Sequence, residues 1–292
     1  MSRGSSLARN VTSNWLGIGL SIVYALIITP IVIRALDTQL YGAWQFLNGL
    51  VAYSELFYLG LGSAIIRFVA QARITNDYAR INRLASIVLT IYATIGLAVL
   101  VAATGVSGSM TKFFPDQLAP ELEQAITYTV ILLGVRVLLI FVTSGFSGLL
   151  AAHDRFDLVN GVNIASLAVR FMAIPWLISM GANPLLTFAW LMCAITALEA
   201  AAMAGLAFWL IPNLSVWPSR PTSAELRLLY GFGLQSFFVL IAFKLISYTD
   251  TVVITRKLGL EAAGWYTPSL QLVEYARMAV GGLAGVLLPR LT

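Results

Sequence analysis

The chain has 292 residues, of which 59% are hydrophobic and 11% are charged. An ordinary soluble domain carries about 25% charged residues, whereas the mean hydropathy here is +0.85. This composition argues against a soluble enzyme or a nucleic-acid-binding domain and predicts an all-α, polytopic membrane protein. We expect the net charge of +5 to reflect basic loops at the membrane surface.

Eight stretches are long and apolar enough to cross a bilayer, whose hydrocarbon core requires about 20 residues per helix. In chain order, they are 12–34, 41–68, 84–106, 125–151, 158–180, 185–211, 229–256 and 263–289. With the N-terminus inside, ten basic residues fall on the cytoplasmic side and four on the other. This bias predicts a cytoplasmic N-terminus.

A proline-rich stretch near residue 212 divides the predicted spans unequally. Residues 1–211 are expected to form a six-helix bundle, 212–228 a cytoplasmic linker, and 229–292 the first two helices of a second bundle. The chain stops as the eighth span ends. Because a repeated architecture would place six helices in each bundle, we expect this chain to be a fragment.

The stretch that joins the first two predicted spans has a partial copy, or echo, later in the chain. A shift of 222 residues lays the stretch from Thr29 on the stretch from Thr251 and superimposes several identical residues, among them Gly42 on Gly264. The same shift places Glu55 on Arg277. The echo predicts an internal repeat in which Glu55 and Arg277 occupy equivalent positions and can meet.

Charged residues within the predicted spans are the candidate functional residues, since a charge at membrane depth is costly. Four are acidic and four basic: Glu55, Glu199, Asp250 and Glu274, with Arg136, Arg170, Lys244 and Arg277. We expect the substrate cavity to involve Glu55, Arg136, Arg170, Lys244 and Arg277. Glu55, Asp250 and Glu274 are the candidates for coupling to an ion.

These residue types suit an anionic cargo. A guanidinium presents a planar fork that binds phosphate in a bidentate manner, and a buried carboxylate can take up a proton or Na⁺. Arg136, Arg170 and Glu199 can equally form a structural network, and Glu274 and Arg277 are spaced to pair on one helix face. Glu55 itself is expected in the middle of an apolar helix, away from water.

Catalytic and metal-binding patterns are missing from the sequence. There is one cysteine and one histidine, and no phosphate-binding loop, so we expect no enzyme activity, no metal and no cofactor. His153 is interpreted as a solvated loop residue and Cys193 as a small packing residue.

The chain resembles the polysaccharide flippases of the multidrug/oligosaccharidyl-lipid/polysaccharide (MOP) exporter superfamily, of the O-antigen or Wzx type. The resemblance rests on TPIVIRALDTQLYGAW, on VLLPRL near the end, and on the pattern of Asp250, Ile254, Gly259, Ala263, Gly264 and Tyr266. It implies a helix bundle like that of multidrug and toxic compound extrusion (MATE) transporters. Helices 1, 2, 7 and 8 would line the cavity, and the cargo would be an oligosaccharide linked to undecaprenyl pyrophosphate.

Two alternatives remain open. One is a cation-coupled drug exporter of the same superfamily that uses Glu55 or Glu274, and the other is a non-transporting scaffold for glycan assembly. Membrane lipids, and glycan polymerases or glycosyltransferases, are the expected partners, and nucleic acid is not.

Overall fold

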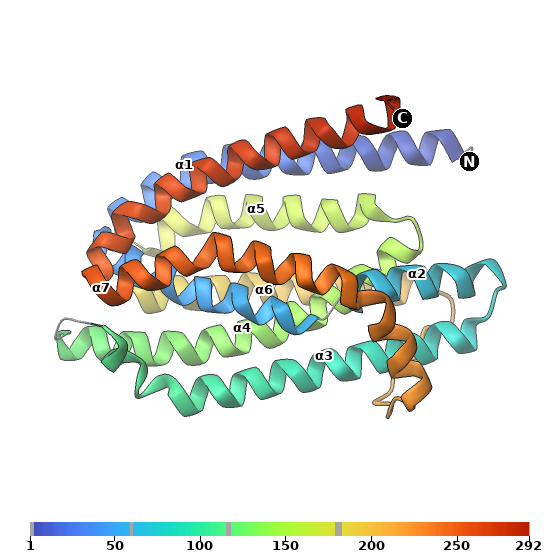
Figure 1. The fold of residues 1–292 in the computed structure, drawn as a ribbon, viewed down its shortest axis with the longest axis horizontal. Helices are drawn as coiled ribbons and strands as arrows, with labels where there is room; N and C mark the ends of the chain where they lie inside the picture. The colour runs from blue at the N-terminus through green and yellow to red at the C-terminus, as the bar shows by residue number, and fades with distance from the viewer. Residues whose placement is uncertain (1–2, 59–60, 115–117, 179–182, 292) are drawn as a thin grey trace.

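The computed structural model describes residues 3–58, 61–114, 118–178 and 183–291, with side chains from residue 19 to residue 277 except 59–60, 111, 115–117, 175–182 and 232–236. The described backbone is helical and contains no strand. Its elements are α1 (Arg3–Ser54), η1 (Glu55–Tyr58), α2 (Leu61–Ile74), α3 (Tyr78–Ser107), η2 (Met110–Phe113), α4 (Pro120–Ala152), α5 (Phe156–Ile178), α6 (Pro184–Leu210) and α7 (Ser223–Leu291). They lie roughly parallel to one long axis (Figure 1).

Six helices within the described residues are long and apolar enough to cross a membrane. Two of them, α1 with 52 residues and α7 with 69, far exceed one crossing. Each is broken at one residue with a non-helical backbone, Asp37 in α1 and Gly259 in α7. Each of these two helices therefore consists of two limbs, one on either side of its break. The prediction of an all-α, multi-pass membrane bundle with eight crossings is confirmed.

The two breaks lie at equivalent positions of the predicted repeat. The shift of 222 residues places Asp37 on Gly259, and their backbones are alike, with φ 66° and ψ 170° in one and φ 90° and ψ 177° in the other. Glycine adopts this region freely, whereas Asp37 adopts it at a cost of about 1–3 kcal/mol. The Asp37 carboxylate accepts a hydrogen bond from the amide of Gln39 at 2.6 Å, which caps the limb that follows.

The two breaks meet at a reciprocal contact between glycines. A Cβ on Gly42 would overlap the carbonyl oxygen of Leu260, and a Cβ on Gly264 would overlap that of Thr38. The repeat lays Thr38 on position 260, so each glycine faces the equivalent carbonyl of the other limb. Small residues allow two helix backbones to approach this closely, and here they join α1 to α7 (Figure 1).

The second predicted span is not one continuous helix. The apolar run 41–68 predicted a helix through Glu55, but α1 ends at Ser54 and Glu55 begins the single 3₁₀ turn η1. The carboxylate therefore lies at a helix break, and 43% of its side chain is exposed rather than sealed from solvent. That part of the expectation was wrong, because no proline marks the break in the sequence.

The stretch between α6 and α7, which lies in the region of the predicted linker, is bound to α3. Helix α7 begins at Ser223 because Thr222 and Glu225 cap each other's amides, at 2.7 and 3.3 Å. Before that, the amides of Ser215, Trp217 and Ser219 donate to side chains along α3. The linker thus fixes the start of α7 against the first six helices.

An ion pair adds to the attachment of the linker to α3. Arg83 donates two hydrogen bonds to Glu225, at 2.9 and 3.0 Å, and a third to the carbonyl of Arg220. The hydrogen bonds from Arg83 lower the pKa of Glu225 to about 2. A lowered carboxyl pKa stabilises the fold above the usual pKa of 4.5, and this contribution is lost as the pH falls toward 2.

We expect Glu225→Gln to lower the unfolding temperature at pH 6, with a difference from wild type that shrinks steadily as the pH falls below about 4.5. Thermal unfolding of the purified protein in detergent across this range measures it. A difference that is constant with pH would contradict the role of the ion pair.

Gly42→Ala and Gly264→Ala are each expected to destabilise the protein by about 1–3 kcal/mol or more, since the added methyl forces the two backbones apart. Gly105→Ala, on α3, is the matched control because a Cβ there meets nothing within 4 Å. Unfolding temperatures in detergent compare them. Equal stability of the three variants would show that the glycine contact is not needed.

Candidate functional site

The first charged contact joins η1, which follows the second limb of α1, to the first limb of α7. Lys244 Nζ lies 2.6 Å from a carboxylate oxygen of Glu55 and 5.1 Å from the centre of the Tyr248 ring. The Lys244 side chain is 8% exposed. A buried ammonium requires such a partner, so Glu55 and the aromatic ring together stabilise its charge.

The second contact lies inside the six-helix part, around Arg136 of α4. Its Nη1 donates to the Asn48 side-chain oxygen of α1 at 2.9 Å, and its Nε to the Thr196 hydroxyl of α6 at 3.3 Å. Arg170 and Glu199 are near enough to act on it electrostatically. Within the described part of the chain, Arg136 forms no ion pair, and its direct partners are neutral.

The third contact pairs α5 with α6. Arg170 donates to Glu199 at 2.6 Å, and the Ser166 hydroxyl donates to the same carboxylate oxygen. Arg170 Nε is buried and has no hydrogen-bond partner among the described residues. Since the charge of Arg170 is already balanced, this cluster resembles the structural network that the sequence left open.

The fourth contact bridges the two limbs of α7. Arg277 donates to Glu274 at 2.8 Å, which confirms the predicted pairing on one helix face, and Ser247 of the first limb lies 3.4 Å from Glu274. Asp250 accepts a hydrogen bond from the Tyr266 hydroxyl at 3.1 Å. These contacts hold the two limbs together on either side of the Gly259 break.

The structure therefore groups the predicted site residues differently from the sequence. Glu55 binds Lys244 and not Arg277, which has its own partner in Glu274. The anticipated meeting of Glu55 and Arg277 is not present in this structure. Sequence reasoning missed Asn48 and Thr196, although an amide within an apolar span is a signal that can be read.

Two cavities in the bundle are lined by residues other than those of the four contacts. One, of about 400 Å³, lies between α1 and the second limb of α7 and is lined by Thr29, Arg34, Gln271 and Tyr275 with apolar neighbours. The other, of about 670 Å³, lies among η1, α2, α3, α4, α5 and the first limb of α7, and its lining includes the hydroxyl-bearing residues Tyr58 and Ser144. Across the described residues, no group of three or more His, Cys, Asp or Glu side chains is placed to bind a metal.

Comparisons with known proteins agree with this architecture. A family described as polysaccharide biosynthesis protein matches residues 7–292. The chain belongs to the polysaccharide biosynthesis protein family. It is 23% identical over 296 aligned residues to the uncharacterized membrane protein EpsK of Bacillus subtilis (strain 168), covering 97% of this chain and 56% of EpsK.

A solved structure shows the fold. The chain is similar to an inward-facing multidrug resistance MATE family transporter of the MOP superfamily, with a TM-score of 0.74 and 14% identity. The match covers 89% of this chain and 60% of that transporter. The chain thus spans somewhat more than half the length of the relatives it matches.

The sequence pattern that resembles the family now has a physical explanation. Asp250 and Tyr266 are its two ends and form a hydrogen bond across the two limbs of α7. Gly259 supplies the positive φ of the break between them, and Gly264 allows α1 to approach. In this polysaccharide biosynthesis protein, the pattern therefore specifies how the two limbs of α7 meet each other and the second limb of α1.

We expect Glu55→Gln to destabilise the protein more than Lys244→Met does. The first change leaves a buried ammonium without its partner, which costs roughly 3–5 kcal/mol in an interior site. The second leaves Glu55, which is more exposed and retains water. Thermal unfolding in detergent provides the comparison.

The double variant is the control. Glu55→Gln with Lys244→Met removes both charges and should recover most of the stability lost in Glu55→Gln alone. Additive losses would contradict a direct interaction between the two residues.

Proposed function

We propose that this protein is part of a transporter that flips a lipid-linked oligosaccharide across the bacterial inner membrane for surface polysaccharide biosynthesis. The cargo would carry an undecaprenyl pyrophosphate. Membership of the polysaccharide biosynthesis family and the MATE-like fold support the proposal. The proposed role is transport rather than enzymatic catalysis.

The observation that carries the proposal is the environment of Arg136. Its guanidinium lies in the bundle and contacts the neutral side chains of Asn48 and Thr196. A cation with neutral partners retains a strong attraction for an anion, and a guanidinium can bind a phosphate with two parallel hydrogen bonds. A pyrophosphate bound there would not have to displace a carboxylate.

The other predicted cations would act differently. Arg170, Lys244 and Arg277 each have a carboxylate partner, so an anion must compete with Glu199, Glu55 or Glu274. We propose that this competition changes helix contacts as cargo passes. Release of Glu55, Asp250 or Glu274 from its partner would allow it to bind a proton or Na⁺, which is the proposed route of coupling.

Orientation and assembly complete the proposal. The N-terminus would lie in the cytoplasm, as the distribution of basic residues in the sequence favours. Residues 1–211 would form one bundle, 212–228 the linker, and 229–292 the first two helices of a second bundle. Glycosyltransferases or a glycan polymerase would be partners, because they supply or consume lipid-linked sugars.

Arg136→Gln in the full-length protein is expected to reduce surface-polysaccharide export about tenfold or more, since one charge-assisted hydrogen bond contributes about 1.5–3 kcal/mol. Arg136→Lys should restore export only partly, because the charge remains but the fork is lost. Complementation of a strain lacking the transporter, scored by surface glycan, measures both.

Arg80→Gln is the control, since Arg80 is an exposed arginine in the first turn of α3. Membrane abundance of each variant must equal that of wild type. Wild-type export by an abundant Arg136→Gln protein would overturn the assignment.

A cation-coupled drug exporter is the second candidate, favoured by the similarity to a multidrug resistance transporter. Under this alternative, Glu55 or Glu274 would exchange Na⁺ or H⁺ for a cationic drug. Expression should then raise resistance to cytotoxic cations, and Glu274→Gln should abolish it. Unchanged drug sensitivity together with restored glycan export would leave the flippase as the function.

A further inference from the structure

The linker, residues 211–222 between α6 and α7, lies along one side of α3. Three of its amides donate hydrogen bonds to three polar side chains of α3 at 3.1 to 3.2 Å, those of Ser215, Trp217 and Ser219 to Asn82, Ser86 and Thr90 respectively. The Asn82 side chain also donates to the carbonyl of Asn213 at 2.9 Å. The linker is therefore attached to α3 by a row of hydrogen bonds.

The spacing of these hydrogen bonds shows how the linker runs. The donors are two residues apart and the acceptors are four residues apart. Two residues of extended chain advance about 6.6 Å, and four residues of α-helix advance about 6.0 Å. The linker therefore runs nearly extended and parallel to α3, so that every second amide meets a polar side chain about one turn further along the helix.

This run takes the linker toward the middle of the membrane span. Helix α3 starts at the end of the bundle that carries Arg73, Arg80 and Arg83, the arginine-rich end, and Arg83 is its last charged residue. Thr90 lies seven residues beyond Arg83, about 10 Å along the helix axis. It is inside the apolar run predicted to begin at residue 84. The Ser219 amide, which donates to Thr90, has entered the span to the same depth.

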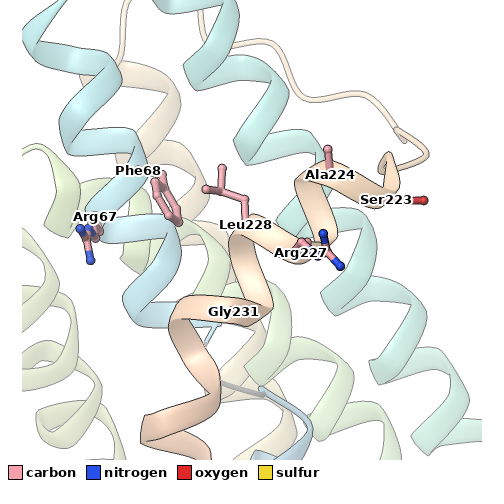
Figure 2. A pocket seen from close by; sticks show the side chains of 7 residues that line it. All are labelled: Arg67, Phe68, Ser223, Ala224, Arg227, Leu228 and Gly231. Carbon is pink, nitrogen blue, oxygen red and sulfur yellow. The ribbon is translucent and has the colours of Figure 1, made fainter.

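After this point the chain turns back to the arginine-rich end. Arg83 donates to the carbonyl of Arg220 and to the carboxylate of Glu225 in the first turn of α7. One turn later, Leu228 extends toward Phe68 of α2 (Figure 2). The linker thus enters the span beside α3 and leaves it again before α7 begins.

The backbone of the linker is suited to this depth. An unpaired backbone amide is costly within a bilayer, because lipid chains offer no hydrogen bonds. Three linker residues are prolines and have no amide proton: Pro212, Pro218 and Pro221. Besides the three amides bound to α3, those of Leu214 and Thr222 have acceptors in Ile211 and Glu225. Side chains of α3 thus bind amides that water would bind in an aqueous loop.

The side chains of the linker divide into an inner and an outer set. Leu214 and Val216 are partly buried and pack against the apolar core. Trp217 has the largest apolar side chain of the linker, yet 74% of it is exposed. Exposure of an indole to water at this position would be costly, so the surroundings of Trp217 decide what the linker does.

The face of α3 that carries the linker is exposed further along the helix. Leu97 and Val101 each lie eleven residues, close to three full turns, beyond Ser86 and Thr90, and therefore on the same face. They are 54% and 63% exposed. Helix α3 lies along one edge of the bundle (Figure 1). A face of this kind, apolar and at the edge of a membrane bundle, is in contact with lipid.

We propose that the linker is an interfacial segment that binds the lipid bilayer, with the indole of Trp217 inserted at the boundary between headgroups and acyl chains. Tryptophan is enriched at this boundary because its ring is apolar and its N–H is polar. Arg220, at the turn of the linker, is exposed and has a side chain long enough to reach lipid phosphates. The connection from α6 to α7 is then anchored in the membrane surface, a role beyond the proposed transport function.

Spin labelling of the full-length protein in vesicles of phosphatidylethanolamine and phosphatidylglycerol tests the depth. A label on Trp217→Cys should collide more often with oxygen, which concentrates in lipid, than with a water-soluble nickel chelate. It should lie about 9 Å deeper than a label on Arg80→Cys, because Ser86 is six residues beyond Arg80. Leu97→Cys provides the reference for the bilayer interior. The unsubstituted protein, in which Cys193 is buried, gives the background signal.

A second measurement leaves the indole in place. The fluorescence of Trp217 is the difference between wild type and Trp217→Phe in the same vesicles. Lipids brominated in the upper part of the acyl chain should quench this difference more strongly than acrylamide dissolved in the water does.

The hydrogen bonds to α3 are tested separately. Ser86→Ala with Thr90→Ala removes two acceptors of the linker, so the label at Trp217→Cys should move toward water. Thr94→Ala is the matched control, since the Thr94 hydroxyl donates to the carbonyl of Thr90 in its own helix. An unchanged label depth in the double variant would show that these bonds do not hold the linker in the membrane.

Two results of the labelling would overturn the proposal. A label at Trp217→Cys that meets the chelate as often as the label at Arg80→Cys would place the linker in water. A label shielded from both oxygen and the chelate would place it beneath another protein surface, whether a partner or a second copy of the chain. None of these measurements depends on glycan export, so this inference and the proposed function fail separately.

Discussion

The close approach of two helix backbones at Gly42 and Gly264 is the constraint on which the candidate site depends. Each glycine faces a backbone carbonyl next to the other helix's break, and neither position has room for a side chain. The contact therefore fixes the crossing of α1 and α7 at one end of the bundle. From there, the descending limbs carry Glu55 and Lys244 to the depth at which they form an ion pair.

The cost of burying charge explains the arrangement of the interior. Lys244, Arg170 and Arg277 each pair with a carboxylate on another helix or the same one, as low polarity requires. Arg136 differs because an amide and a hydroxyl satisfy its hydrogen bonds while its charge is balanced only at a distance. Such a residue is costly to keep as structure alone, which favours a role in binding an anion.

The number of crossings and the repeat could be predicted from the sequence, because apolar length determines a span and the 222-residue echo is visible in the residues. The backbone breaks at Asp37 and Gly259 became apparent only in the structure. The sequence did not reveal that Glu55 binds Lys244, because pairing depends on how each helix is rotated about its axis. The start of α7 could have been read from Thr222 and Glu225, a capping box that the proline-rich context concealed.

The linker and the contact between α2 and α7 both determine how the first six helices hold α7. Hydrogen bonds from the linker to α3 hold the start of α7 at the arginine-rich end, and the glycine contact holds its break at the other. Between them, cavities lie beside α2. The first limb of α7 is therefore held near its start by the linker and at its break by the glycine contact, with open space beside α2.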